Sequence, residues 1–160
     1  MGFDSETAFE SALIKCLVEE KGWKDGVIKY PTEKDLLDNW AKIIFENNRD
    51  IDRLGDFPMT DGEMAQIMGQ IAKLRTPLNL NGFINGGTVQ IIRDNENDTH
   101  NFKKTISLKI FDRNEIAAGR TRYQIAQQPK FKAKNSIYPN RRGDFCLLIN
   151  GMPVIHVELK

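Results

Sequence analysis

The feature that most constrains the fold is a β-hairpin near the end of the 160-residue chain. Two apolar runs, residues 145–149 and 154–157, flank the dipeptide Asn150-Gly151. Asn-Gly between two such runs is a strong hairpin signal, because both residues tolerate the positive φ angles of a tight two-residue turn. The pairing of the two runs decides which side chains share a face, since successive residues of a strand point to opposite sides.

Two registers are possible for this hairpin, and they place its acidic residues differently. A plain two-residue turn sets Asp144 opposite Val157 and turns Glu158 to the other face. A three-residue loop, or a two-residue turn followed by a one-residue bulge, sets Asp144 opposite Glu158. We predict the second register because it gathers Asp144, Glu158 and Lys160 on one face. The opposite face is then entirely apolar and consists of Phe145, Leu147, Ile149, Ile155, Val157 and Leu159.

Amphipathic helices are predicted in the first half of the chain. Residues 6–21 carry an apolar stripe at helical spacing, which consists of Phe9, Ala12, Leu13, Cys16 and Leu17. Thr32 is followed three residues later by Asp35, and Thr60 by Glu63, which is the pattern of a capping box. These signals predict a second helix that begins at Thr32 and a third that begins at Thr60.

Strands dominate the second half of the chain. Residues 79–87 are rich in Asn and Gly, which is typical of a loop, and residues 94–101 form a polar connection. Strands are predicted at residues 88–93, 105–112, 122–128, 145–149 and 154–160. Because helices come first and strands later, we predict an α+β fold, similar to an α/β sandwich, with a mixed sheet that ends in the hairpin.

Composition excludes several classes of protein. The chain is 40% hydrophobic and 28% charged, ordinary values for one soluble domain with a core. No apolar run reaches the roughly 18–20 residues of a membrane span, and the N-terminus has no signal-peptide pattern. We therefore expect a cytoplasmic location and no membrane partner. Cys16 and Cys146 are expected to be reduced. With only His100 and His156 besides, none closely spaced, a four-ligand zinc site is excluded.

A basic stretch precedes the hairpin acids. Residues 113–142 contain eight Lys/Arg and a single acid, Glu115. Such a stretch can hold a phosphate backbone, and Arg142 lies two residues before Asp144, on the same side of an extended chain. A solvated strand edge, where lysines discourage aggregation, is the alternative. The residues that could line a DNA groove are Arg120, Arg122, Lys130, Lys132, Lys134 and Arg142.

The hairpin acids are candidate metal ligands. Opposed residues of a β-ladder lie about 4.5–5.5 Å apart, and carboxylates so close repel each other. Mg²⁺ removes this conflict because it prefers oxygen ligands, and Lys160 could orient a water molecule or offset charge that develops on a phosphate. Metal-assisted phosphodiester hydrolysis is one interpretation of Asp144, Glu158 and Lys160, and a structural salt bridge is the other.

The same residues resemble the PD-(D/E)xK nuclease signature, in the form D-x13-E-x-K across a short hairpin. Residues 142–160 (RGDFCLLINGMPVIHVELK) are similar to the stretch R-P-D-I-V-L-F-V-N-G-x-P-L-V-V-I-E-L-K of the N-terminal nuclease domain of type I restriction enzyme R (restriction/translocation) subunits. The N-G-x-P turn and the E-L-K ending make this match more specific than the acidic signature alone. Residues 7–23 (TAFESALIKCLVEEKGW) resemble the first helix of that family, F-E-x-x-I-x-x-x-L-x-x-x-G-W. The likeness extends loosely over residues 87–93, 110–114 and 122–128.

The resemblance implies roles for individual residues. Asp144 and Glu158 match the metal-binding acids of the family. Lys160 matches its catalytic lysine, and Glu10 matches the acid on its first helix. On a helical wheel Glu10 lies at the flank of the apolar stripe, where a carboxylate is expensive to bury without a partner. Gly143 departs from the family, which usually has proline there, at a position that brings no ligand.

The resemblance also implies a function. It predicts a restriction-endonuclease-like core over residues 1–160 that hydrolyses double-stranded DNA with Mg²⁺ as cofactor, in a complex with modification and specificity subunits. The family's ATP-driven motor domains, and its helix and strand after the hairpin, are not in this sequence, which has no G-x-x-x-x-G-K-[ST] pattern. We therefore expect a truncated N-terminal endonuclease domain that is weakly active or inactive alone. The alternatives are a non-catalytic docking module of the same complex and a standalone repair or recombination nuclease of the same fold.

Overall fold

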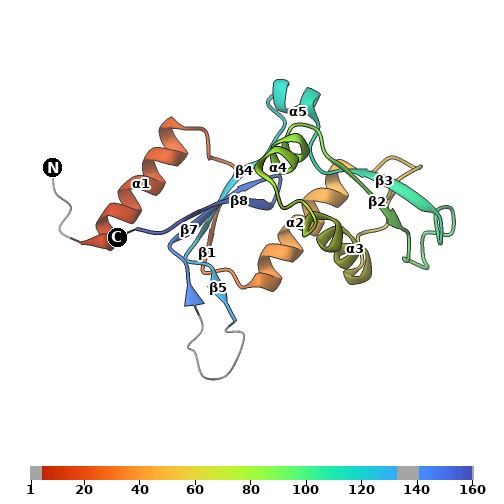
Figure 1. Cartoon of the computed structure of the whole chain (residues 1–160), viewed down its shortest axis with the longest axis horizontal. Coiled ribbons are helices and arrows are strands. Elements are labelled where there is room, and N and C mark those ends of the chain that lie inside the picture. The colour runs from red at the N-terminus through yellow and green to blue at the C-terminus, as the bar shows by residue number, and fades with distance from the viewer. Residues whose placement is uncertain (1–4, 133–140, 160) are drawn as a thin grey trace. The chain divides into compact units, whose positions relative to one another are not determined.

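The computed structural model describes residues 5–132 and 141–159 of the chain (Figure 1). Its helices are α1 (Glu6–Glu20), α2 (Glu33–Asn47), α3 (Asp61–Ile71), α4 (Pro77–Ile84) and α5 (Arg113–Ala117). Its strands are β1 (Val27–Lys29), β2 (Thr88–Ile92), β3 (Thr105–Lys109), β4 (Tyr123–Gln127), β5 (Lys130–Phe131), β6 (Arg141–Arg142), β7 (Phe145–Ile149) and β8 (Met152–Val157). Helices combined with a mixed sheet confirm the predicted α+β class.

The chain divides into two compact units. Unit 1 consists of Met1–Leu37 and Arg122–Lys160, and unit 2 consists of Asp38–Thr121. Within the described part of the chain, no helix combines the length and the apolar character that crossing a bilayer demands.

The sheet of unit 1 contains four strands in the order β1-β4-β7-β8. β1 runs parallel to β4, whereas β7 is antiparallel to both of its neighbours, so the sheet is mixed as predicted. Two short strands, β5 and β6, pair beside it in a ribbon of their own.

Both faces of this sheet are covered. On one face, Phe145 and Leu147 pack with Ile125 and with Ile14 of α1. On the other, a second cluster contains Ala126, Cys146, Leu148 and Leu36, which belongs to the first turn of α2. A strand that is buried on both sides must be apolar throughout, which explains the continuous apolar sequence of β7.

The hairpin formed by β7 and β8 has the predicted register. Asn150 and Gly151 form a two-residue turn with φ angles of 50° and 84°, and Ile149 pairs with Met152 beside it. The register then shifts by one residue between Leu147 and Leu148, which is a β-bulge. Beyond the bulge, Phe145 pairs with Val157, as the second register requires.

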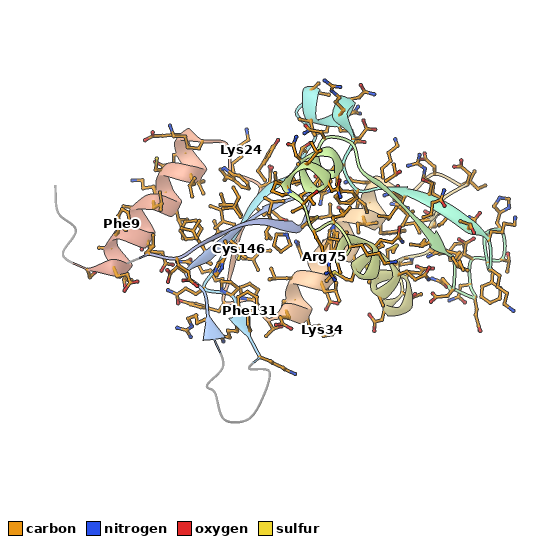
Figure 2. All side chains as sticks on the ribbon, in the orientation of Figure 1. Phe9, Lys24, Lys34, Arg75, Phe131 and Cys146 are labelled. Atoms are coloured by element: carbon orange, nitrogen blue, oxygen red, sulfur yellow. The ribbon has the colours of Figure 1, made fainter. Side chains whose placement is uncertain are left out.

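The two cysteines are free, as predicted. Cys146 lies in the middle of the sheet (Figure 2) and is buried. Burial raises the pKa of its thiol above the ordinary value, because the charged thiolate is poorly solvated there.

Unit 2 is organised around the antiparallel ribbon of β2 and β3. The side-chain amide of Gln66, on α3, bonds to both backbone groups of Ile92 at 2.8 and 2.9 Å. Gln70, one turn further along α3, donates to the carbonyl of Gln90 at 2.7 Å. Two glutamine side chains thus occupy backbone groups of β2 that would otherwise be open to pairing with another strand.

A buried ion-pair cluster fixes the loops of unit 2. Arg93 is fully buried, and its guanidinium donates to Glu63 at 2.6 Å and to Asp98 at 2.9 Å. It also donates to the backbone carbonyls of Phe57 and Pro58. Burial alone would raise the pKa of Asp98, but hydrogen bonds, first from Arg93, outweigh it and hold that pKa below its ordinary value.

Both predicted capping boxes are present. Thr60 and Glu63 exchange side-chain and backbone bonds at the start of α3. At the start of α2, the backbone N–H of Thr32 donates to Asp35 at 2.8 Å, and the N–H of Asp35 donates to the Thr32 hydroxyl at 3.2 Å. The backbone N–H of Thr32, and then its hydroxyl, donate to the Asp35 carboxylate and hold its pKa below the ordinary value.

Two local predictions were wrong. Residues 79–87 are not all loop, because Pro77 opens α4 at its first turn behind the N-cap Thr76; proline's missing N–H is harmless at that position. Of the predicted stripe on α1, Phe9 is exposed, whereas Leu13 and Leu17 are partly buried against the core; the fully buried residues of the helix are Glu10 and Ile14.

We expect Arg93→Met to lower the free energy of unfolding by about 3–5 kcal/mol, because it leaves Glu63 and Asp98 buried without their cation. Arg49→Met is the matched control, since Arg49 pairs with Asp56 on the exposed surface, where an ion pair contributes about 0–1 kcal/mol. Urea denaturation measures both variants. Equal losses would contradict a supporting role for the buried cluster.

Candidate active site

Asp144 and Glu158 come together at the open end of the hairpin. Phe145 pairs with Val157, so one further step in the same register sets Asp144 opposite Glu158. The backbone N–H of Leu159 donates to a carboxylate oxygen of Asp144 and closes the end of the ladder. Asp144 is half-buried and Glu158 is exposed. Both acids therefore lie next to the last pair of the ladder, and that they face each other stays a prediction from the sequence.

Glu10 is a nearly buried carboxylate on α1, only 4% exposed. The side-chain amide of Gln127 donates to its Oε1 at 2.7 Å, and the amide of Gln128 donates to its Oε2 at 3.1 Å. Among the described residues no cation lies within salt-bridge distance of Glu10. Neutral amides alone therefore hold this carboxylate, at the end of β4.

Gln128 connects Glu10 to Asp144. Its backbone N–H donates to the carbonyl of Asp144 at 2.7 Å, while its side chain contacts Glu10. Acids from the first helix and from the last hairpin thus adjoin the same residue. Three carboxylates predicted from the sequence, Glu10, Asp144 and Glu158, belong to the same end of the sheet.

The donor set suits a hard cation. Asp144 and Glu158 offer carboxylate oxygens, the ligands that Mg²⁺ prefers. Over residues 5–132 and 141–159, no group of three or more His, Cys, Asp or Glu side chains is close enough to hold a metal ion. Lys160 lies outside the described residues, so its predicted place beside the acids rests on the sequence.

Two of the predicted basic residues are brought together. Lys130 pairs with Arg142 between β5 and β6. Both cations lie over the ring of Tyr30, at 5.9 and 5.7 Å from its centroid. Arg142 also donates to the side chain of Gln128 at 3.3 Å. A positively charged surface therefore adjoins the acids.

A cavity of about 430 Å³ lies next to this surface. Figure 2 labels Lys34 and Phe131, which line it from α2 and β5. Lys130 and Lys132 also line it, together with Thr32 and Glu33. Lys132, predicted to contact DNA, is thus next to Lys130.

The other predicted basic residues are placed differently. Arg122 precedes β4 and lies beside the Asn150 turn, since it exchanges backbone and side-chain bonds with Asn150. At 3.3 Å per residue it is about 20 Å from Gln128. Arg120 belongs to unit 2, and Lys134 lies outside the described residues.

Gly143 fits the structure as glycine. Its backbone N–H donates to the carbonyl of Pro129 at 3.1 Å, a bond that proline could not make. A Cβ there would lie 2.6 Å from Nε2 of His156, so the exposed His156 ring would have to move. The departure from the resembled family is therefore consistent with this local packing.

Sequence reasoning missed three residues at this site: Tyr30, Gln127 and Gln128. An amide carries no charge and belongs to no metal or acid–base motif, so nothing marked the two glutamines. The sequence did carry one signal, because Tyr30 and Gln128 each precede a proline. In the structure both residues have positive φ angles, 55° and 49°.

The fold and the paired hairpin acids define the class: an α+β domain with a candidate acidic site at the open end of a β-hairpin. The family described as "Type I restriction enzyme R protein N terminus" matches residues 4–160. The chain belongs to this family.

Two relatives illustrate the similarity. The chain is 28% identical over 164 residues to the type I restriction enzyme SsaAORF53P endonuclease subunit of Staphylococcus saprophyticus. It is 28% identical over 162 residues to the type I restriction enzyme SauCOLORF180P endonuclease subunit of Staphylococcus aureus strain COL. Each alignment covers 100% of this chain and 15% of the relative. The chain thus corresponds to a small part of those subunits.

We expect Gln127→Met to lower the free energy of unfolding by about 1.5–3 kcal/mol, the value of a hydrogen bond to a charged group. The variant keeps the size of the side chain but removes the shortest bond to the Glu10 carboxylate. Gln90→Met, at an exposed position of β2, is the control and should change stability by less than about 0.5 kcal/mol. Urea denaturation tests both, and a Gln127→Met variant as stable as the control would contradict the expectation.

Proposed function

We propose that this chain is the DNA endonuclease domain of a type I restriction enzyme R subunit, with a PD-(D/E)xK site. The observation that carries the proposal is the bulged register of the hairpin, which pairs Phe145 with Val157. Continued by one residue, this register would oppose Asp144 and Glu158. Membership of the R-protein N-terminal family supports the same assignment. The proposed substrate is double-stranded DNA, and residues 1–160 form the proposed domain.

Asp144 and Glu158 are the proposed Mg²⁺ ligands, because both offer oxygen donors at the end of the hairpin. When bound, Mg²⁺ supplies a Lewis acid that polarises a phosphate oxygen. The bond from the N–H of Leu159 limits the rotation of the Asp144 carboxylate. Asp144 is therefore held in place before any ligand arrives.

Glu10 and Lys160 complete the proposed catalytic set. Gln127 and Gln128 hold the Glu10 carboxylate without neutralising it, so its negative charge remains available to the site. Lys160 is the point charge that would orient the attacking water or offset charge on the phosphate. Its role rests on the E-x-K spacing from Glu158.

DNA would be held by the basic residues near the acids. Lys130 and Arg142 lie together over Tyr30, and Lys132 lines the neighbouring cavity. Lys and Arg bind phosphate oxygens without reading sequence. This fits a domain that cuts without choosing its target. Arg122 would contact DNA only where the duplex extends to the opposite end of β4.

The rest of the activity is assigned to other chain segments and subunits. The chain corresponds to 15% of the relatives it matches, so ATP-driven translocation is proposed for the remainder of the R subunit. Target recognition and methylation are proposed for the specificity and modification subunits of the complex.

We expect Asp144→Ala and Lys160→Ala to reduce DNA cleavage at least about 100-fold, the loss typical of removing a group that stabilises developing charge. The assay is plasmid cleavage by the full-length R subunit in its complex, with Mg²⁺ and ATP. ATP hydrolysis by the same preparations shows that the complex has assembled.

Lys24→Ala, an exposed residue between α1 and β1 (Figure 2), is the matched control and should cut normally. Undiminished cutting by both the Asp144 and the Lys160 variants would overturn the nuclease assignment. A docking role for the chain would then be the better interpretation.

The basic surface predicts a salt-dependent effect. Lys130→Ala and Arg142→Ala should each weaken DNA binding to about the same extent on any sequence. Each should also reduce the slope of log K against log salt by about 1, because one phosphate contact is lost. Fluorescence anisotropy with a short duplex at several salt concentrations measures the slope. Slopes that equal that of Lys24→Ala would contradict phosphate contacts here.

A further inference from the structure

Gln128, directly after β4, has a backbone conformation that its residue type rarely adopts. Its φ angle is 49°, in the left-handed region, where residues other than Gly, Asn, Asp and His are uncommon. Tyr30, at the end of the neighbouring strand β1, has a φ angle of 55°. Its N–H donates to the carbonyl of Gln127 at 2.8 Å. Unfavourable backbone conformations of this kind persist where the surrounding structure holds them, and they concentrate at functional sites.

The side chain of Gln128 makes two bonds of opposite kind. Its amide nitrogen donates to Glu10, and its amide oxygen accepts from Arg142. The reverse orientation would set the NH₂ group against a guanidinium and the oxygen against a carboxylate, so chemistry fixes which way the amide points. The backbone N–H meanwhile binds the carbonyl of Asp144.

We propose that Gln128 is a positioning residue, which holds Glu10 and Arg142 in fixed places beside Asp144. The proposal rests on the proposed function, because Glu10 and Asp144 are catalytic only if the chain is a nuclease. A neutral amide suits this role. It binds an anion and a cation at once, yet adds no charge that would compete with Mg²⁺ for Glu10 or with DNA for Arg142.

The stability of the fold alone would not require a glutamine at position 128. Gln127 already gives Glu10 its shortest bond, at 2.7 Å, from inside the regular strand. Glycine would adopt the left-handed conformation without strain, and the bond to Asp144 uses only the backbone. The glutamine side chain is therefore explained by what it orients.

Gln128→Gly separates the two roles. We expect a melting temperature close to that of the native protein, because relief of the backbone offsets the lost hydrogen bonds to Glu10 and Arg142. The Mg²⁺ concentration for half-maximal cleavage by the assembled enzyme should rise about 10–100-fold, the usual effect of removing a residue that orients the groups around a metal site. Mn²⁺ affinity of the full-length subunit without DNA, measured by calorimetry, should fall by the same factor.

Two further variants sharpen the test. Gln128→Asn keeps the amide and tolerates the left-handed backbone, but it is one methylene shorter, so its metal requirement should lie between those of the native protein and Gln128→Gly. In a Glu10→Gln background, Gln128→Gly should add little, because residues that act through each other are not additive. The control is Lys103→Gly in unit 2, which relieves a φ of 61° and should leave the metal requirement unchanged.

The outcomes distinguish this proposal from the nuclease assignment. A native metal requirement in Gln128→Gly, with Asp144→Ala inactive, overturns the positioning role and leaves the nuclease. A lowered melting temperature with native metal affinity assigns Gln128 a structural role and also overturns the proposal. Normal cutting by Asp144→Ala overturns the nuclease and the positioning role together.

Discussion

The candidate site depends on the pairing register of one β-hairpin, because the register decides which side chains share a face. Side chains alternate along a strand, so a shift of one residue would send Glu158 to the face opposite Asp144. With the Asn150-Gly151 turn alone, Asp144 and Glu158 would lie on opposite faces of the hairpin. The bulge between Leu147 and Leu148 corrects it, and the ladder reaches Phe145 and Val157 in the register that opposes the acids. A single extra residue therefore decides whether two carboxylates can share a ligand.

The protein handles its buried carboxylates in two contrasting ways. In unit 2, Glu63 and Asp98 share the guanidinium of Arg93, which offsets part of their negative charge and fixes the surrounding loops. In unit 1, Glu10 is also buried, and within the part of the chain that the structure describes its carboxylate receives only glutamine amides. Carboxylates that already share a cation have less capacity for another one than a carboxylate held by neutral amides. This contrast distinguishes the carboxylates that stabilise the fold, Glu63 and Asp98, from the Glu10 carboxylate, which is suited to bind a ligand.

Much of the fold could be predicted because its signals are local. Thr32 and Thr60 mark helix starts through bonds to residues three positions away, and Asn150 marks the hairpin. β1 could not be predicted, since three residues carry no clear pattern and the strand exists only by pairing with β4. The acids were visible through their spacing. Gln127 and Gln128 were not, because their importance comes from Glu10, which is remote in sequence.

Unit 1 is assembled from both ends of the sequence, and all of unit 2 lies between those ends. Glu10 emerges early during synthesis and Asp144 emerges late. Bringing such distant segments together has an entropic cost that grows with the length of the intervening loop. Collapse of the intervening residues shortens that loop in effect, and α1 gains its buried contacts only when β4 and β7 are present. The acids of the candidate site therefore cannot meet before the whole of unit 2 has been synthesised, and a shorter nascent chain lacks one of them.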